Sequence, residues 1–127
     1  MTHSVLVVED EPNIVLSLKF VLKQAGFNVR VAEDGAQAIT EIERDTPDAV
    51  LLDIMLPKRD GFSVCEAIRA NPAWSAIKII VLSARSREAD KEKALAVGAD
   101  DFITKPFSTR DLGNRVKSLI AAGAGEA

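Results

Sequence analysis

Residues 4–12 read SVLVVEDEP, an apolar run that ends in three acidic residues and a proline. A continuous apolar run of this length is typical of a strand buried on both faces, and Pro12 suits the first turn of a following helix. Three more strand-like runs end in reactive residues: Ala49–Leu52 before Asp53, Ile77–Leu82 before Ser83, and Phe102–Thr104 before Lys105. In a parallel sheet all four endings lie at one edge, where open α/β sheets bind ligands.

The strand-like runs alternate with segments whose apolar residues have helical spacing. Helices are predicted from Pro12 to about Gly26, between Asp34 and Pro47, from about Arg87 to Val97, and from Ser108 onward. A turn is predicted at Pro57–Gly61, followed by a helix that carries Val64, Cys65 and Ile68 and is broken at Asn71-Pro72. A further strand is predicted at Val29–Val31. Alternation of this kind predicts an α/β fold, with a parallel sheet covered by helices on both faces. Arg30, Asp101 and Thr104 make the second and fifth strands polar, as edges are, which favours the doubly wound, flavodoxin-like (βα)5 order 2-1-3-4-5.

The length and composition indicate one folded domain. The 127 residues are 47% hydrophobic and 28% charged, and the net charge of −3 argues against direct binding of nucleic acid. Cys65 is the sole cysteine, so an intrachain disulfide is excluded. No apolar run approaches the ~18 residues that span a bilayer, so we expect a cytoplasmic protein without membrane contact. The domain is expected to occupy residues 1–121, with residues 122–127 forming a frayed tail or the start of a linker.

Taken one at a time, the residues at the strand ends have ordinary explanations. Glu9 and Asp10 are compatible with solvated carboxylates, Asp53 with a helix N-cap, Ser83 with a loop hydroxyl and Lys105 with a surface lysine. Their joint placement at the same end of four strands is what favours a functional site.

The chemistry of this set suits a divalent cation and a phosphoryl group. Carboxylates a few ångströms apart repel each other, and Mg²⁺ takes carboxylate oxygens while keeping water and phosphate ligands. A carboxylate is also a nucleophile towards phosphorus. In this interpretation Asp53 attacks phosphorus, Glu9 and Asp10 hold the cation, and Lys105 and Ser83 bind phosphoryl oxygens.

Several stretches resemble the receiver domain of two-component response regulators, from about Ser4 to Ile120. They are Glu9–Pro12, Leu51–Pro57 with Asp60-Gly61, Leu82–Ala84, and Gly98–Phe107. The resemblance implies a domain that takes a phosphoryl group from a sensor histidine kinase or a phosphotransfer protein. It also implies a signalling phosphoacceptor, not an enzyme, which catalyses only its own phosphorylation and dephosphorylation.

The resemblance assigns roles residue by residue. Asp53 matches the phosphoacceptor, Asp10 the direct Mg²⁺ ligand, and Glu9 the neighbouring acid that usually acts through water. Met55 matches the position whose backbone carbonyl completes the metal site. Lys105 matches the phosphate-binding lysine.

A second group of matches concerns the response to phosphorylation. Ser83 matches the switch hydroxyl, Ala84 the small residue that leaves room for the phosphate, and Phe102 the switch aromatic. Lys105-Pro106 matches a peptide bond that is usually cis in the family. The resemblance implies that Ser83 moves towards the phosphoryl group and Phe102 turns inward, which remodels the surface of the fourth helix, fifth strand and fifth helix. Because Phe102 lacks the hydroxyl of tyrosine, we expect its inward state to be easy to reach.

The predicted fourth helix is rich in charge, which suits either a solvated face or a partner surface. Lys93, Asp100, Asp101, Asp111 and Arg115 resemble the charged dimer face of response regulators that carry a winged-helix DNA-binding domain and regulate transcription. The resemblance implies a two-fold dimer after phosphorylation, with Lys93–Asp111 and Asp101–Arg115 pairs across it.

Three rival functions fit less well. A haloacid-dehalogenase-type phosphatase needs a second aspartate two residues after the nucleophile, where this chain has Met55. A flavodoxin-like FMN binder needs a phosphate loop after the first strand, where Glu9, Asp10 and Glu11 would repel the phosphate. A phosphate-independent structural or protein-interaction domain on the same fold leaves the strand-end residues without an explanation.

Overall fold

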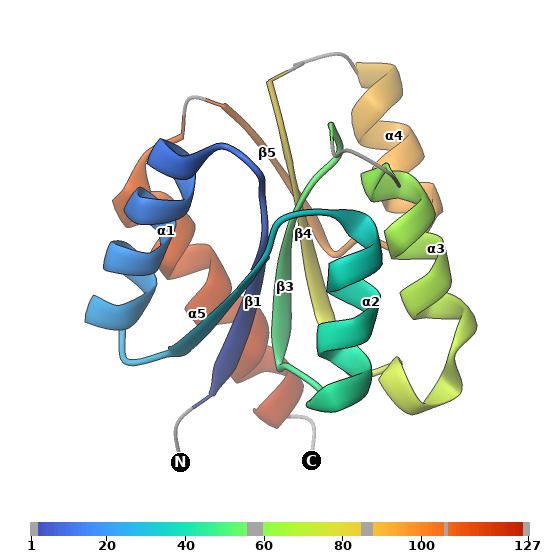
Figure 1. Ribbon diagram of the computed structural model, residues 1–127, viewed down its shortest axis with the longest axis horizontal. Helices are drawn as coiled ribbons and strands as arrows, with labels where there is room; N and C mark the ends of the chain where they lie inside the picture. The colour runs from blue at the N-terminus through green and yellow to red at the C-terminus, as the bar shows by residue number, and fades with distance from the viewer. Residues whose placement is uncertain (1–2, 56–59, 85–87, 106, 126–127) are drawn as a thin grey trace.

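A single parallel sheet organises the computed structural model, which describes residues 3–55, 60–84, 88–105 and 107–125 (Figure 1). Within these residues the strand order is β2-β1-β3-β4-β5, and every neighbouring pair is parallel. The strands are β1 (Ser4–Val8), β2 (Asn28–Ala32), β3 (Ala49–Asp53), β4 (Lys78–Ser83) and β5 (Asp101–Thr104). The fold class and strand order predicted from the sequence are confirmed, with the polar strands β2 and β5 at the edges.

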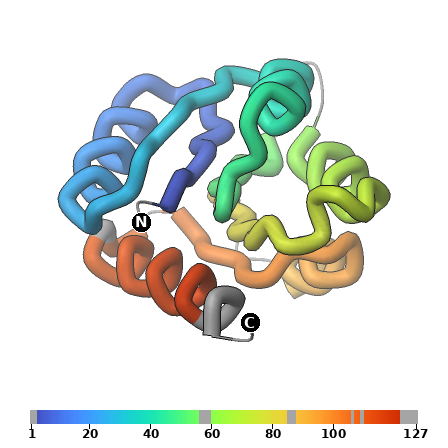
Figure 2. Tube along the Cα trace, turned by 90° about the horizontal axis from the view of Figure 1, so that it is seen from below, coloured from blue at the N-terminus to red at the C-terminus, as the bar shows by residue number. Residues whose placement is uncertain are grey.

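Helices cover both faces of this sheet. They are α1 (Pro12–Gln24), α2 (Gly35–Arg44), α3 (Gly61–Ala70), α4 (Glu88–Ala96) and α5 (Thr109–Gly125). Figure 2 shows α1 and α5 together on one face and α2, α3 and α4 on the other. A short 3-10 helix, η1 (Pro72–Trp74), precedes β4 and was not predicted from the sequence. None of the helices in the described part of the chain combines the length and apolar character that crossing a lipid bilayer requires.

Side-chain caps start the helices where the sequence predicts. The Glu11 side chain accepts a hydrogen bond from Ile14 N at the start of α1, and Ser108 Oγ accepts one from Asp111 N at the start of α5. Asp34 and Asp60 cap α2 and α3 in the same way. These caps place the carboxyl ends of the strands directly beside helix N-termini.

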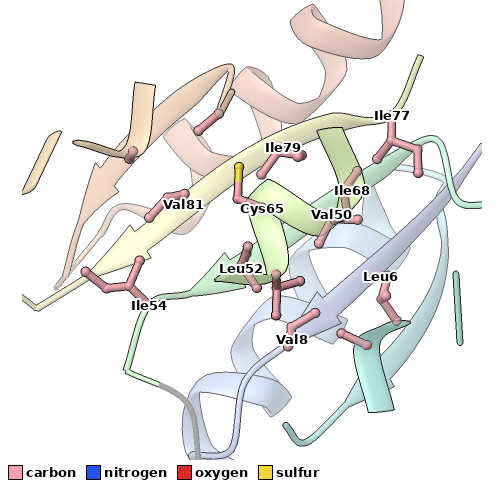
Figure 3. Close-up of a cluster of buried hydrophobic side chains, with 14 of the residues drawn as sticks. Leu6, Val8, Val50, Leu52, Ile54, Cys65, Ile68, Ile77, Ile79 and Val81 are labelled. Atoms are coloured by element: carbon pink, nitrogen blue, oxygen red, sulfur yellow. The ribbon is translucent and has the colours of Figure 1, made fainter. Parts of the chain in front are cut away.

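The sheet separates two hydrophobic cores, because successive side chains of a strand point to opposite faces. One core packs β-strand residues against α2, α3 and α4, and the other packs them against α1 and α5. Figure 3 shows Cys65 and Ile68 of α3 among buried side chains of β1, β3 and β4. On β5, Phe102 belongs to the first core and Ile103 to the second. The buried strands β1, β3 and β4 thus end at or next to Glu9, Asp53 and Ser83.

The last helix extends into the C-terminal segment. α5 continues to Gly125, whereas residues 122–127 were expected to form a frayed tail or a linker. The domain limit at residue 121 stays a prediction. Residues 57–59 of the predicted turn, Arg87 at the predicted helix start and the Lys105–Pro106 peptide bond lie outside the described residues.

Candidate functional site

The strand ends bring three carboxylates together. One carboxylate oxygen from each of Glu9, Asp10 and Asp53 lies within 4.8 Å of the others. Glu9 and Asp10 directly follow β1, and Asp53 is the last residue of β3, which pairs with β1 through Leu52 and Val8. Glu9 and Asp53 are buried, whereas Asp10 is exposed. The arrangement is the one expected when parallel strands end at a common edge.

Lys105 supplies a positive charge between two of these acids. Its Nζ lies 2.7 Å from Glu9 Oε1 and 3.1 Å from Asp53 Oδ2. The side chains of Glu9, Asp53 and Lys105 are only 1%, 6% and 15% exposed, respectively. Buried carboxylates this close need a counter-charge to remain ionised, and among the described residues the ammonium of Lys105 provides it.

Glu9 is held by hydrogen bonds on both oxygens. Oε1 accepts from Lys105, and Oε2 accepts from the backbone N–H groups of Asp10 and Glu11 at 3.2 Å each. Burial raises the pKa of Glu9, and the neighbouring Asp53 carboxylate adds to this, although the Lys105 hydrogen bond acts in the opposite direction. Burial alone would lower the pKa of Lys105, but its hydrogen bond to Glu9 and the charge of Asp53 raise it overall. Glu9 and Asp53 therefore favour the ionised form of Lys105.

The carboxylate of Asp53 is oriented by its own loop. Oδ1 accepts a hydrogen bond from Met55 N at 3.0 Å, and Ile54 N donates to Leu82 O of β4 at 3.2 Å. The Met55 side chain points outward and is exposed, so its backbone is the part that lies beside the acids. The predicted role of the Met55 carbonyl at a metal ion stays a prediction.

Ser83 is the last residue of β4, and Phe102 lies on the neighbouring strand β5, where it pairs with Val81. Ser83 ends β4 and is fully buried, and its carbonyl accepts a hydrogen bond from Lys105 N at 2.7 Å. Phe102 is 9% exposed and packs in the core that includes Ala94 of α4 and Ala99. The structure thus connects the site edge to α4 through β4 and β5. Movement of these residues stays a prediction.

Three of the predicted surface residues pair within this chain. Arg115 Nη1 lies 3.3 Å from Asp101 Oδ2, and Arg115 Nε lies 3.2 Å from Asp111 Oδ2. Arg115 therefore joins β5 to the first turn of α5. These pairs are partly exposed, so each contributes only about 0–1 kcal/mol to stability.

The other two predicted surface residues face α3. Lys93 Nζ lies over the ring of Phe62, 4.4 Å from its centroid. Asp100 Oδ2 accepts hydrogen bonds from Arg69 Nη2 at 2.9 Å and from Ile79 N at 2.8 Å. Arg69 was missed by the sequence analysis, because a basic residue in the last turn of a helix gives no sign of a partner far along the chain.

Fold and site together define a doubly wound α/β domain with an acidic, lysine-bearing site at the carboxyl ends of its strands. A model of the response regulator receiver domain matches residues 5–117. The chain belongs to the response regulator receiver domain family. It is therefore a signalling domain of the two-component class, and the phosphatase, FMN-binding and phosphate-independent alternatives are not favoured.

Two curated relatives support this membership. The sensory transduction protein RegX3 of Mycolicibacterium smegmatis is 44% identical over 121 residues, which cover 95% of this chain and 52% of the relative. The alkaline phosphatase synthesis transcriptional regulatory protein PhoP of Bacillus subtilis is 42% identical over 120 residues, which cover 94% of this chain and 49% of the relative. The chain spans about half the length of these relatives.

Solved structures show the same fold. A putative response regulator from Chloroflexus aurantiacus superposes with a TM-score of 0.91 at 34% identity, covering 95% of this chain and 99% of that one. A CheY-like receiver domain protein from Methanospirillum hungatei gives a TM-score of 0.92 at 26% identity over the full length of both chains.

Proposed function

We propose that Asp53 accepts a phosphoryl group in a Mg²⁺-dependent reaction, with the phosphohistidine of a sensor histidine kinase or phosphotransfer protein as the donor. The observation that carries the proposal is the placement of Asp53: its buried carboxylate lies 3.1 Å from the Lys105 ammonium, within a cluster of three acids. In the reaction a carboxylate oxygen of Asp53 forms a bond to phosphorus while the P–N bond breaks, and the imidazole leaves with its electron pair and takes up a proton.

The residues present fit a magnesium ion. All the side-chain donors are carboxylate oxygens, which Mg²⁺ prefers, and the described residues place no histidine or cysteine ligand in the cluster. Asp10, Asp53 and the Met55 carbonyl would hold the ion directly. Glu9 would act through water, the role of the family's acid at the position that it matches. The ion would neutralise charge on the phosphoryl oxygens.

Lys105 and Ser83 are proposed to hold the transferred group. The Lys105 ammonium already bridges Glu9 and Asp53, so a phosphoryl oxygen on Asp53 would lie within its reach. Ser83, at the end of the neighbouring strand β4, would donate a hydrogen bond from its hydroxyl group to another phosphoryl oxygen. Because Phe102 on β5 belongs to the same hydrophobic core as Ala94 of α4, a movement of Ser83 would reach α4 through this core.

We further propose that phosphorylation changes the surface formed by α4, β5 and α5 for dimerisation or partner binding, as in regulators with a winged-helix output domain. The intrachain pairs of Arg115 with Asp101 and Asp111 refine this proposal. A dimer with Asp101–Arg115 pairs across the interface must exchange these partners for those of a second copy. Lys93 must likewise leave the ring of Phe62 to reach Asp111. Asp100, whose carboxylate binds Arg69 and Ile79 N, stays a proposed member of this surface and would likewise have to change partners in a dimer.

The test is phosphorylation by a small donor. The protein is incubated with Mg²⁺ and acetyl phosphate, and intact mass spectrometry counts the phosphoryl groups before and after treatment with hydroxylamine. We expect one hydroxylamine-sensitive group, which is absent in Asp53→Asn and after removal of Mg²⁺ with EDTA. Asp45→Asn, at an exposed helix end away from the cluster, is the matched control and is labelled normally. A folded wild-type protein that takes up no group, or an Asp53→Asn variant that is still labelled, contradicts the proposal.

A further inference from the structure

Gly61, the first residue of α3, lies in direct contact with the backbone that carries the proposed phosphoacceptor. A Cβ atom built at Gly61 would lie 2.6 Å from the carbonyl oxygen of Asp53, 2.6 Å from Ile54 Cα and 3.1 Å from the carbonyl carbon of Asp53. Gly61 N also donates a hydrogen bond to Ile54 O at 3.1 Å. The start of α3 and the end of β3 therefore approach more closely than any residue with a side chain permits.

The atoms that a Cβ would meet cannot turn away. All three belong to the main chain, and that segment is fixed on its other side by β4, because Asp53 pairs with Leu82 and Ile54 N donates to Leu82 O. A side chain at position 61 must therefore push α3 away or displace residues 53–54. Displacement of Asp53 also moves Met55, since Met55 N donates to Asp53 Oδ1.

We propose that Gly61 is a positioning residue for phosphoryl transfer: its missing side chain lets α3 hold the Asp53 carboxylate and the Met55 peptide where metal and phosphoryl group must meet. The inference rests on the function proposed for Asp53. It explains the Asp60-Gly61 pair as one unit, in which Asp60 caps α3 by accepting from Ser63 N at 2.9 Å and Gly61 sets the distance between α3 and β3. Misplacement of a reacting group by about 1 Å costs on the order of 100-fold in rate.

Two other residues provide matched controls. A Cβ at Gly113 in α5 would meet only Val21 Cγ2, at the ordinary distance of 3.7 Å, so Gly113→Ala makes the same substitution without a collision. Asp60→Ala removes the N-cap of α3 and destabilises that helix without adding an atom near Asp53. Together they separate an effect on the site from an effect on stability.

The experiment measures the rate of labelling by acetyl phosphate as a function of Mg²⁺ concentration in the wild type and in Gly61→Ala, Gly113→Ala and Asp60→Ala, with unfolding in urea measured for each. We expect the maximal rate of Gly61→Ala to fall by about 10–100-fold and its half-saturating Mg²⁺ concentration to rise. We expect Gly113→Ala and Asp60→Ala to retain the wild-type half-saturating concentration. A helix-stability role alone would not move that concentration.

The outcomes distinguish the inference from the function on which it rests. If the wild type is labelled and Gly61→Ala has wild-type rate and Mg²⁺ dependence, the inference is overturned alone. The same holds if Gly61→Ala changes only as much as Asp60→Ala at a similar loss of stability. If Gly61→Ala does not fold in buffer, the series is repeated in trimethylamine N-oxide, which favours the folded state, and wild-type behaviour there overturns the inference. A wild type that takes up no phosphoryl group overturns both proposals.

Discussion

Lys105 Nζ lies 2.7 Å from Glu9 Oε1, closer than the 3.1 Å that separates it from Asp53 Oδ2. The lysine is therefore bound most closely to the acid that is least exposed. In this arrangement the ammonium stabilises the carboxylate cluster in the way that a bound cation would. Lys105 and Mg²⁺ are thus expected to share the task of neutralising the same acids.

Lys105→Met is expected to lower the free energy of unfolding by about 3 kcal/mol without Mg²⁺, since it leaves two buried carboxylates without their counter-charge. Mg²⁺ stabilises the protein because it binds the folded state alone. Saturating Mg²⁺ should add more stability to this variant than to the wild type, because in the variant the lysine no longer neutralises the same acids. Urea unfolding with and without MgCl₂ measures both increments. Lys78→Met, at the opposite end of β4, serves as the control. Equal Mg²⁺ increments in the wild type and in Lys105→Met would show that lysine and ion act on different groups.

Arg115→Ala is expected to weaken the proposed phosphorylation-dependent dimer while barely changing monomer stability. Its two intrachain pairs are partly exposed and contribute only about 0–1 kcal/mol each. Sedimentation velocity with Mg²⁺ and fluoroberyllate, a phosphoryl mimic, should show association of the wild type and less of the variant. Arg44→Ala, on the exposed side of α2, should behave as the wild type. A wild type that stays monomeric with and without the mimic would refute the dimer.

Gly98→Ala is expected to destabilise the protein by two separable effects. Gly98 has φ +107°, a backbone conformation that costs other residues about 1–3 kcal/mol. An added Cβ would also lie 2.4 Å from Arg69 Cγ, and Arg69 is held in place by hydrogen bonds to Gly98 O and Asp100. In an Arg69→Ala background the same substitution should cost less, since only the backbone effect remains. A double-mutant cycle in urea measures the difference, and identical costs in the two backgrounds would exclude the steric effect.

The buried thiol of Cys65 is expected to make stability fall at alkaline pH. Burial raises the pKa of Cys65 from its ordinary value of 9.0 to about 11, although the Arg69 guanidinium acts in the opposite direction. Between these values the unfolded chain has lost the thiol proton and the folded chain still holds it. The free energy of unfolding therefore decreases as pH rises from about 9 to 11. Cys65→Ala should lack this part of the decrease when both proteins are unfolded in urea across the range. Parallel pH profiles would show that the thiol does not contribute.

The sequence predicted the strand order, because polar residues mark the second and fifth strands as edges. It also predicted the convergence of Glu9, Asp10, Asp53 and Lys105, because each follows or ends an apolar run. The contacts that Arg115 and Lys93 make within the chain could not be predicted from the sequence. Charge type at Arg115 and Lys93 is visible in the sequence, but the choice between a partner in the same chain and one in another copy depends on side-chain direction. The bond between Arg69 and Asp100 joins residues 31 positions apart, a pairing that spacing within a helix does not indicate. The collision that makes Gly61 necessary likewise depends on how closely two backbones approach.

The 96 positions between Glu9 and Lys105 have a consequence for synthesis of the protein. Ribosomes release Glu9 and Asp10 early, whereas the lysine that neutralises Glu9 follows β5, the last strand to emerge. Until β5 has paired with β4, a nascent chain carries the acids without their cation, and closing so long a loop is among the slow steps of folding. A chain that has not yet formed β5 therefore lacks the lysine contact that neutralises Glu9 and Asp53 in the folded domain.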